Sequence, residues 1–330
     1  MNEENLRKEI MEAFDDPKTL LEPNINYIHS GNYALNWLLC GKFFGGWPVG
    51  SVNEAFGDPS TGKSLILLQA GAQIQKAGGI FFDDDTEDAH KDENLETLGV
   101  DTDPTMYRKV IPPSANIHDC FVRAATTVRK VAFRIPYVYA IDSISVISSK
   151  WSMTNNEYKE DQGRKAKEIR GGLDFLWNAI HETEENTGRK SSGIFLISRH
   201  SISNPKQYGK KSPKGGDAPG YYSTIRLLME KPIQWPKDNP RGVMINVQVI
   251  KSRVCYGHEG AGGWFFVDWK TGVDQHSGIL QILSMIGLAK DCKNGYFEVE
   301  GFDKSLSMQT ISKEDNWSRM LELLQMLDSK

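Results

Sequence analysis

Apolar and polar residues follow two alternating patterns along most of this chain. Short apolar runs bounded by turn residues predict buried strands at residues 52–56, 79–82, 137–141 and 193–197. Apolar residues spaced three and four apart predict helices over residues 88–98 and 117–131, and a further helix that carries Ile169, Leu173, Leu176 and Ile180. Strands that alternate with helices are typical of a parallel sheet covered on both faces. We therefore expect an α/β fold with ligands beyond the carboxyl ends of the strands.

The later part of the chain has a different pattern. Residues 243–254 and 263–267 are strand-like with no long helix between them, which predicts an antiparallel extension of the sheet. After about residue 273, an apolar segment at 278–283 and an end helix over 317–327 predict a small C-terminal α/β segment. Beyond the first 30 residues we expect two parts, a core and a small C-terminal domain: residues 31–272 and 273–330.

The first 30 residues are polar and acidic. Their apolar residues are spaced as one face of a short helix: Leu6, Ile10, Met11 and Phe14. One short helix is not stable by itself, so we expect it to dock on something larger. Its partner is either the core of the same chain or a neighbouring subunit, which would make residues 1–30 a polymerisation segment.

Composition and charge restrict the classes of function. A net charge of −4 does not indicate a nucleic-acid-binding protein, so any such surface must be local. The four cysteines lie far apart without a C-x-x-C pair, which argues against a zinc site or a disulfide framework and favours a reducing cytoplasm. The acidic N-terminus has no apolar leader, and no run of about 18 apolar residues occurs, so we expect neither a secreted nor a membrane protein.

One segment carries a complete phosphate-loop motif, G-x-x-x-x-G-K-S. It follows the predicted strand at 52–56 and leads into an apolar helix, which is the context that the motif requires. Its residues are Gly57, Asp58, Pro59, Ser60, Thr61, Gly62, Lys63 and Ser64. The glycines let successive N–H groups point at phosphates, while Lys63 supplies a cation and Ser64 a hydroxyl for Mg²⁺. The sequence therefore predicts that the chain binds a nucleoside triphosphate.

Carboxylates follow two of the predicted strands. Asp142 ends the strand at 137–141, where an aspartate reaches the Mg²⁺ shell beside a phosphate loop; a helix N-cap is the alternative. Residues 83–88 carry five carboxylates, and like charges this close cost energy unless a cation or solvent relieves them. Either one of them orients an attacking water molecule, or the segment is a solvated acidic loop that caps the next helix.

A pair of cations follows an apolar strand. Ile245, Val247 and Val249 alternate along one face, and period two places Lys251 and Arg253 on that same face after the apolar run stops. The two cations are therefore expected to emerge together at the edge of the core. Solvated surface cations are the alternative.

A second group of cations lies in a turn-rich segment, residues 201–214, which contains no acidic residue. Tyr208 offers a stacking plane there, and the lysines of the segment are Lys206, Lys210, Lys211 and Lys214. Neutralisation of phosphates by such lysines predicts contact with nucleic acid and an affinity that falls with salt. A plain flexible loop is the alternative.

These landmarks, in this order, resemble the RecA family of strand-exchange recombinases, and most closely its bacteriophage UvsX branch. The resemblance covers about residues 30–300. Besides the phosphate loop, its landmarks are residues 30–32, 45–50, 85–87, 98–101, 141–143, 197–200, 215–216, 249–253, 277–280 and 293–296. The resemblance implies a RecA-like P-loop core, mostly a parallel sheet with the antiparallel extension, plus the small C-terminal segment.

The resemblance also implies roles for individual residues. Glu87 corresponds to the family's water-orienting base, and His200 to a group that senses the γ-phosphate and relays its presence to the DNA-binding loop. Arg199 is a departure from the family, and an alignment slip of one residue would exchange its role with that of His200. Lys251 and Arg253 correspond to cations that reach across a filament interface to the neighbour's ATP.

Two DNA loops are implied as well. Residues 201–214 correspond to the family's second DNA loop, and the first would lie within residues 148–165 and include Lys150, Arg164 and Lys165. Asn94 stands where the family carries an aromatic residue that stacks on adenine. ATP is therefore the expected nucleotide, with base selectivity left open.

We accordingly expect a DNA-dependent ATPase that uses ATP and Mg²⁺. It would form helical filaments on single-stranded DNA and pair it with homologous duplex DNA in recombination, repair and recombination-dependent replication. Expected partners are single-strand-binding and mediator proteins, without a membrane, in the cytoplasm, where a phage-encoded protein would act in its bacterial host. The rivals are a hexameric helicase on the same core and a recombinase paralogue that loads another recombinase without appreciable hydrolysis.

Overall fold

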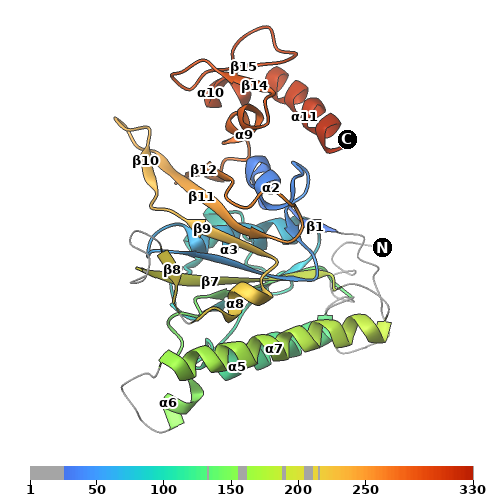
Figure 1. Cartoon of the computed structure of the whole chain (residues 1–330), viewed down its shortest axis with the longest axis vertical. Coiled ribbons are helices and arrows are strands. Elements are labelled where there is room, and N and C mark those ends of the chain that lie inside the picture. The colour runs from blue at the N-terminus through green and yellow to red at the C-terminus, as the bar shows by residue number, and fades with distance from the viewer. Residues whose placement is uncertain are drawn as a thin grey trace.

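One large sheet forms the centre of the molecule (Figure 1). The computed structural model describes residues 26–131, 134–154, 162–187, 191–203, 211–214 and 216–329. Parallel strands follow one another in the order β9-β3-β7-β6-β4-β5. Their bounds, in that order, are Ile225–Met229, Ser51–Gly57, Gly193–Ser203, Tyr137–Asp142, Ile80–Asp85 and Tyr107–Lys109. The predicted α/β fold with a parallel sheet is confirmed.

Antiparallel strands extend the sheet beyond β9. β11 pairs with β9, β12 with β11 and β13 with β12, while β10 pairs with β11 and β8 with β7. The bounds of β8 and β10 to β13 are Lys211–Pro213, Ile233–Trp235, Gly242–Ser252, Gly262–Asp268 and Gly272–Val273. The predicted antiparallel extension is therefore also confirmed.

Helices cover both faces of the sheet (Figure 1). α5 and α7 pack on one face and α2 and α3 on the other, with bounds Ile117–Val131, Gln162–Thr187, Tyr33–Cys40 and Lys63–Lys76. Neighbouring strand residues alternate between the two cores, since Phe81 packs on the side of α3 and Phe82 on the side of α5. The predicted stripe on α7 is fully buried: Ile169, Leu173, Leu176 and Ile180.

Short elements complete the core. α4, α6 and α8 are brief helices, and β1 and β2, each two residues long, pair with each other in an antiparallel ribbon. Their bounds are Asp92–Thr97, Lys150–Thr154, Ala218–Tyr222, Tyr27–Ile28 and Trp47–Pro48. None of the described helices is long and apolar enough to cross a membrane. The predicted helical face at residues 6–14 lies outside the described residues.

The C-terminal segment lies beyond α2 and consists of α9, β14, β15, α10 and α11 (Figure 1). The bounds are Ile279–Met285, Ala289–Asp291, Phe297–Val299, Met308–Ile311 and Glu314–Asp328. Its apolar residues belong to the same core cluster as α2 and α3. Asn32 ties the two parts together, because its Nδ2 donates to the carbonyl of Ser277 over 2.8 Å.

The helix predicted over residues 88–98 begins later than expected. α4 starts only at Asp92, because the preceding residues turn around the carboxylate of Asp85. That carboxylate accepts from the backbone N–H groups of Ala89 and His90 over 3.1 and 2.8 Å, and Asp88 takes a φ of 50°. A carboxylate from the preceding strand thus supplies the partners that a helical turn would have supplied.

The face of β11 changes before Lys251, which corrects the predicted alternation. A β-bulge lies between Val249 and Lys251, so Lys251 pairs with Arg226 while Val249 pairs with Leu227. Burial follows this shift, since Val249 and Ser252 are buried and Lys251 is partly exposed. The extra residue moves Lys251 to the opposite face from the apolar run.

Adjacent glycines on α7 allow a test of the contact between α5 and α7. A Cβ atom at Gly172 would lie 2.1 Å from Cδ2 of buried Phe121, whereas one at Gly171 would meet no atom within 4 Å. We expect Gly172→Ala to lower the free energy of unfolding by about 1–3 kcal/mol through overpacking. Gly171→Ala, the control, should raise it by up to about 1 kcal/mol because alanine is the better helix former. Urea unfolding of both variants measures the difference in their free energies of unfolding. Equal values would show that α5 and α7 move apart at this contact without a cost in stability.

Candidate active site

The phosphate loop connects the end of β3 to the start of α3. Gly62 takes a φ of 90°, and a Cβ there would lie 2.6 Å from the side chain of Ile245, so the position requires glycine. Thr61 Oγ1 donates to the carbonyl of Asp58 over 2.9 Å and closes the loop. No side chain caps the N-terminus of α3, which leaves its first N–H groups for an anion.

Lys63 lies across this loop. Its Nζ donates to the carbonyls of Asp58 and Gly57 over 2.7 and 3.3 Å, and the residue is only 6% exposed. Burial lowers the pKa of Lys63, while the carboxylates of Asp142, Glu87 and Asp58 oppose this shift. A buried ammonium that donates to backbone carbonyl oxygens is suited to receive the charge of a phosphate.

Asp142 ends β6 next to the phosphate loop, as predicted from its position. One carboxylate oxygen accepts from Ser198 Oγ, and the other lies 3.1 Å from Nε2 of His90. Burial would raise the pKa of Asp142, but hydrogen bonds from His90, Ser198 and Ser64 lower it overall. The carboxylate of Asp142 and the hydroxyl of Ser64 are hard oxygen ligands in contact with each other, so these two residues fit Mg²⁺.

Glu87 and His200 meet beside the phosphate loop. Nε2 of His200 lies 3.2 Å from Oε1 of Glu87, and Ser143 Oγ donates to the same oxygen over 2.6 Å. The side chain of His200 is 26% exposed and that of Glu87 is 31% exposed, so solvent and ligands can reach both. Two residues 113 positions apart thus form one constellation with Lys63 and Asp142.

The remaining carboxylates of residues 83–88 are not equivalent to Glu87. Asp83, Asp84 and Asp85 are fully buried on β4, and Asp84 accepts from the backbone N–H and hydroxyl of Ser114. Asp88 is exposed and lies near Lys91 and Lys109. The alternative of a solvated acidic loop does not describe the three buried aspartates, and the geometry favours Glu87 as the group beside a phosphate.

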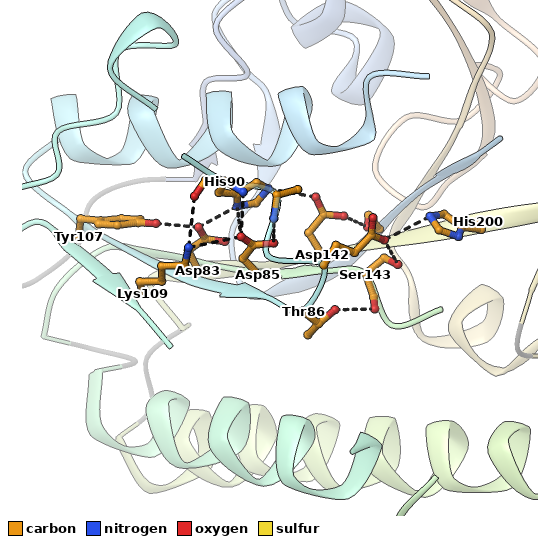
Figure 2. Close-up of polar contacts among 12 residues, drawn as sticks. Asp83, Asp85, Thr86, His90, Tyr107, Lys109, Asp142, Ser143 and His200 are labelled. Carbon is orange, nitrogen blue, oxygen red and sulfur yellow. Dashed lines mark hydrogen bonds and ion pairs between the residues drawn. The ribbon is translucent and has the colours of Figure 1, made fainter. Parts of the chain in front are cut away.

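A buried polar cluster that the sequence analysis missed lies behind Asp142 (Figure 2). His90 contacts Asp83 and Asp142, and Tyr107 OH donates to Asp83 Oδ2 over 2.8 Å. Lys109 Nζ lies 3.4 Å from Oδ2 of Asp85. Pairing of β4 with β5 places Asp83 beside Lys109, a non-local contact that spacing along the chain does not reveal.

Arg199 has a different position from its neighbour His200. Its guanidinium is fully buried and forms a 2.6 Å ion pair with Glu54, which also accepts from Arg226 Nε over 2.5 Å. Burial lowers the pKa of Arg199, and the charge of Glu54 opposes this shift. The same guanidinium donates to the carbonyls of Lys214 and Gly216 over 2.6 and 2.7 Å. The geometry therefore favours His200, not Arg199, as the predicted phosphate sensor.

Lys251 and Arg253 emerge together, although not on the predicted face. Lys251 Nζ donates to the carbonyl of Gly220 and Arg253 to that of Tyr221, each over 2.6 Å, so both cations lie at the C-terminal end of α8. Burial, followed by the charges of Arg253 and Arg226, lowers the pKa of Lys251 to about 8.

The residues predicted to bind DNA fall in two regions. Lys206, Tyr208 and Lys210 lie outside the described residues, Lys211 begins β8, and the backbone N–H of Lys214 donates to the carbonyl of His200 over 2.8 Å. That bond joins the end of the basic segment directly to the residue that contacts Glu87.

The first predicted DNA loop has mixed exposure. Lys150 is exposed at the start of α6, and the Arg164 guanidinium lies 3.5 Å from the ring centroid of Trp151. Lys165 is only 3% exposed, and its Nζ donates to the carbonyl of Ser145 over 2.9 Å. This buried position does not favour a DNA contact for Lys165.

Asn94 is exposed on α4. Its place in the pocket for the nucleotide base stays a prediction.

Comparison with known proteins places these features in a family. The family model of the RecA N-terminal domain matches residues 7–262 of the chain. The protein named Protein RecA of Corynebacterium efficiens is 27% identical over 284 residues, which cover 84% of this chain and 68% of that protein. Protein RecA of Corynebacterium urealyticum is 26% identical over 313 residues, which cover 93% of this chain and 78% of that protein.

Proposed function

The chain belongs to the RecA family, and from this premise we propose that it is an ATP-dependent DNA recombinase. The single observation that carries the proposal is the contact between Glu87 and His200 beside the phosphate loop. A carboxylate that can orient water and a histidine that can sense a phosphate then lie in direct contact, 3.2 Å apart.

We propose that ATP binds with its phosphates on the loop at residues 57–64. Lys63 and the N-terminus of α3 would neutralise the phosphate charge, and Ser64 with Asp142 would hold Mg²⁺, which offsets charge on the phosphate oxygens. Glu87 would orient the attacking water. Ser143 supports this role because its hydroxyl fixes one oxygen of the Glu87 carboxylate.

We propose that nucleotide and DNA binding are coupled through β7. His200 contacts Glu87 with its side chain and accepts from Lys214 with its carbonyl, so one residue joins the phosphate site to the basic segment at 201–214. Single-stranded DNA would bind there and at Lys150 and Arg164, by phosphate neutralisation and stacking. Homologous duplex DNA would then be read by base pairing.

Assembly into a helical filament is the further part of the proposal. Lys251 and Arg253 emerge side by side from the end of β11. They would bind the phosphates of the ATP on a neighbouring subunit and so complete that subunit's nucleotide site, like an arginine finger supplied in trans. Single-strand-binding and mediator proteins are the partners that such a filament would need. The finer assignment to the phage UvsX branch, and thus to a phage-infected cell, rests on the sequence landmarks.

The test combines three measurements on the purified chain. ATP hydrolysis should rise when single-stranded DNA is added, filaments should form with ATP and DNA in electron micrographs, and the filaments should pair a homologous duplex. A closed ring that unwinds a forked duplex would point to the helicase rival. Nucleotide binding with negligible hydrolysis in the presence of DNA would point to the paralogue rival.

A further inference from the structure

His90 lies between two carboxylates at the ends of neighbouring strands (Figure 2). Its Nδ1 is 2.9 Å from Oδ2 of Asp83 at β4, and its Nε2 is 3.1 Å from Oδ2 of Asp142 at β6. The residue is 4% exposed. The imidazole therefore bridges the proposed Mg²⁺ ligand to a carboxylate that takes no part in the proposed phosphate site.

Both ring nitrogens of His90 donate in this arrangement. Carboxylate oxygens only accept, so each of the two contacts needs an N–H on the ring, and an imidazolium satisfies both. The ring thus forms a doubly donating bridge between the two aspartates.

The far end of the bridge is fixed by further contacts. Tyr107 OH donates to the Asp83 oxygen that faces His90, over 2.8 Å. The backbone N–H of His90 donates to Asp85 over 2.8 Å, and its carbonyl accepts from Lys109 Nζ over 3.2 Å. Since the backbone and the ring of His90 are both held, the position of its Nε2 is set by β4 and β5 and not by the nucleotide site.

The near end of the bridge sets the orientation of Asp142. Ser198 holds one oxygen of that carboxylate and His90 the other, so the plane of the carboxylate is defined from both sides. The hydroxyl of Ser64 on the phosphate loop is a further hydrogen-bond partner of this carboxylate. Partners of this kind behind a metal ligand orient it, and their loss typically weakens metal binding.

We propose that His90 is a positioning residue for Asp142, which it holds in the orientation that binds Mg²⁺ together with the nucleotide. The inference rests on the proposed function, because it takes Asp142 as a Mg²⁺ ligand. The competing explanation is that His90 only neutralises Asp83 and Asp85 and so stabilises the fold. The two explanations predict different Mg²⁺ binding when the contact at Asp83 is lost but the contact between His90 and Asp142 is kept.

The experiment measures the Mg²⁺ concentration that gives half-maximal Mg²⁺-dependent binding of a fluorescent ADP analogue, without turnover. In His90→Leu, which loses both donors, this concentration should rise about tenfold or more. In His90→Gln, whose side-chain NH2 group can reach only one of the two carboxylates, the rise should be smaller. Tyr107→Phe is the matched control, because it removes a hydrogen bond to the same Asp83 oxygen without touching Asp142, and its Mg²⁺ requirement should stay within about twofold of the unmodified protein.

Equal Mg²⁺ requirements of His90→Leu and the unmodified protein would overturn the inference. An equal rise in Tyr107→Phe and His90→Leu would also overturn it, because the cluster would then act only on the fold. If His90→Leu does not fold, as judged by circular dichroism, the comparison of His90→Gln with Tyr107→Phe carries the same decision. Nucleotide binding by the unmodified protein is measured as well. If it does not depend on Mg²⁺, the proposed function itself is overturned and not only the role of His90.

Discussion

Replacing Glu87 by glutamine is expected to lower the rate of DNA-stimulated ATP hydrolysis about 10²–10⁴-fold while nucleotide binding is retained. The amide keeps the shape of the side chain and an oxygen that accepts from Ser143, but it cannot act as a base. Phosphate release measured with and without single-stranded DNA gives the rate, and a fluorescent nucleotide gives the affinity. Filaments of this variant should persist, because hydrolysis no longer loosens them.

Asp88→Asn is the control for the loss of a carboxylate in the same acidic segment. Asp88 is the next residue along the chain, its side chain is 77% exposed, and it lies near Lys91 and Lys109 instead of the phosphate loop. Its hydrolysis rate should equal that of the unmodified protein. A normal rate in Glu87→Gln together with a large loss in Asp88→Asn would move the base to Asp88 and contradict the role given to Glu87.

Replacing Arg199 by methionine is expected to lower the free energy of unfolding by about 3 kcal/mol or more. The fully buried carboxylate of Glu54 would lose one of its two cationic partners, and the carbonyls of Lys214 and Gly216 would lose a common donor. Urea unfolding followed by tryptophan fluorescence measures the loss.

Two comparisons isolate the buried ion pair as the cause. Arg241→Met removes an arginine whose side chain is 60% exposed and paired with Asp268 over 3.5 Å, and it should cost less than about 1 kcal/mol. Adding Glu54→Gln to Arg199→Met should cost less than the sum of the two single changes, because the buried charge is then removed as well. Strict additivity would show that Arg199 and Glu54 do not depend on each other.

Elements defined by local patterns could be predicted from the sequence. The helix expected over residues 117–131 has those bounds, because one apolar stripe and nearby turns define it locally. The phosphate loop and Asp142 were also predicted, since a motif and a strand end fix their positions. The structure brings Lys63, Asp142, Glu87 and His200 to one edge of the sheet, as the order of landmarks implied.

Features that depend on pairing between distant segments could not be predicted in this way. His90 is a lone histidine in an acidic stretch, and its role is visible only when β4, β5 and β6 are aligned. Arg199 likewise owes its position to Glu54 on a neighbouring strand. The burial of Lys165 depends on the carbonyl of Ser145, twenty residues away.

The bulge in β11 also determines which length changes this strand tolerates. Before it, every second residue faces the core, and after it the phase is reversed, so that Ser252 and not Lys251 is buried. Deleting the one residue between Val249 and Lys251 would restore the simple alternation and leave the Lys251 ammonium on the face opposite to Val249, because these two residues already pair with the adjacent residues Leu227 and Arg226. A deletion at the bulge is therefore the length change that this part of β11 tolerates, whereas a deletion between Ile245 and Val249 would reverse the face of every residue on one side of it.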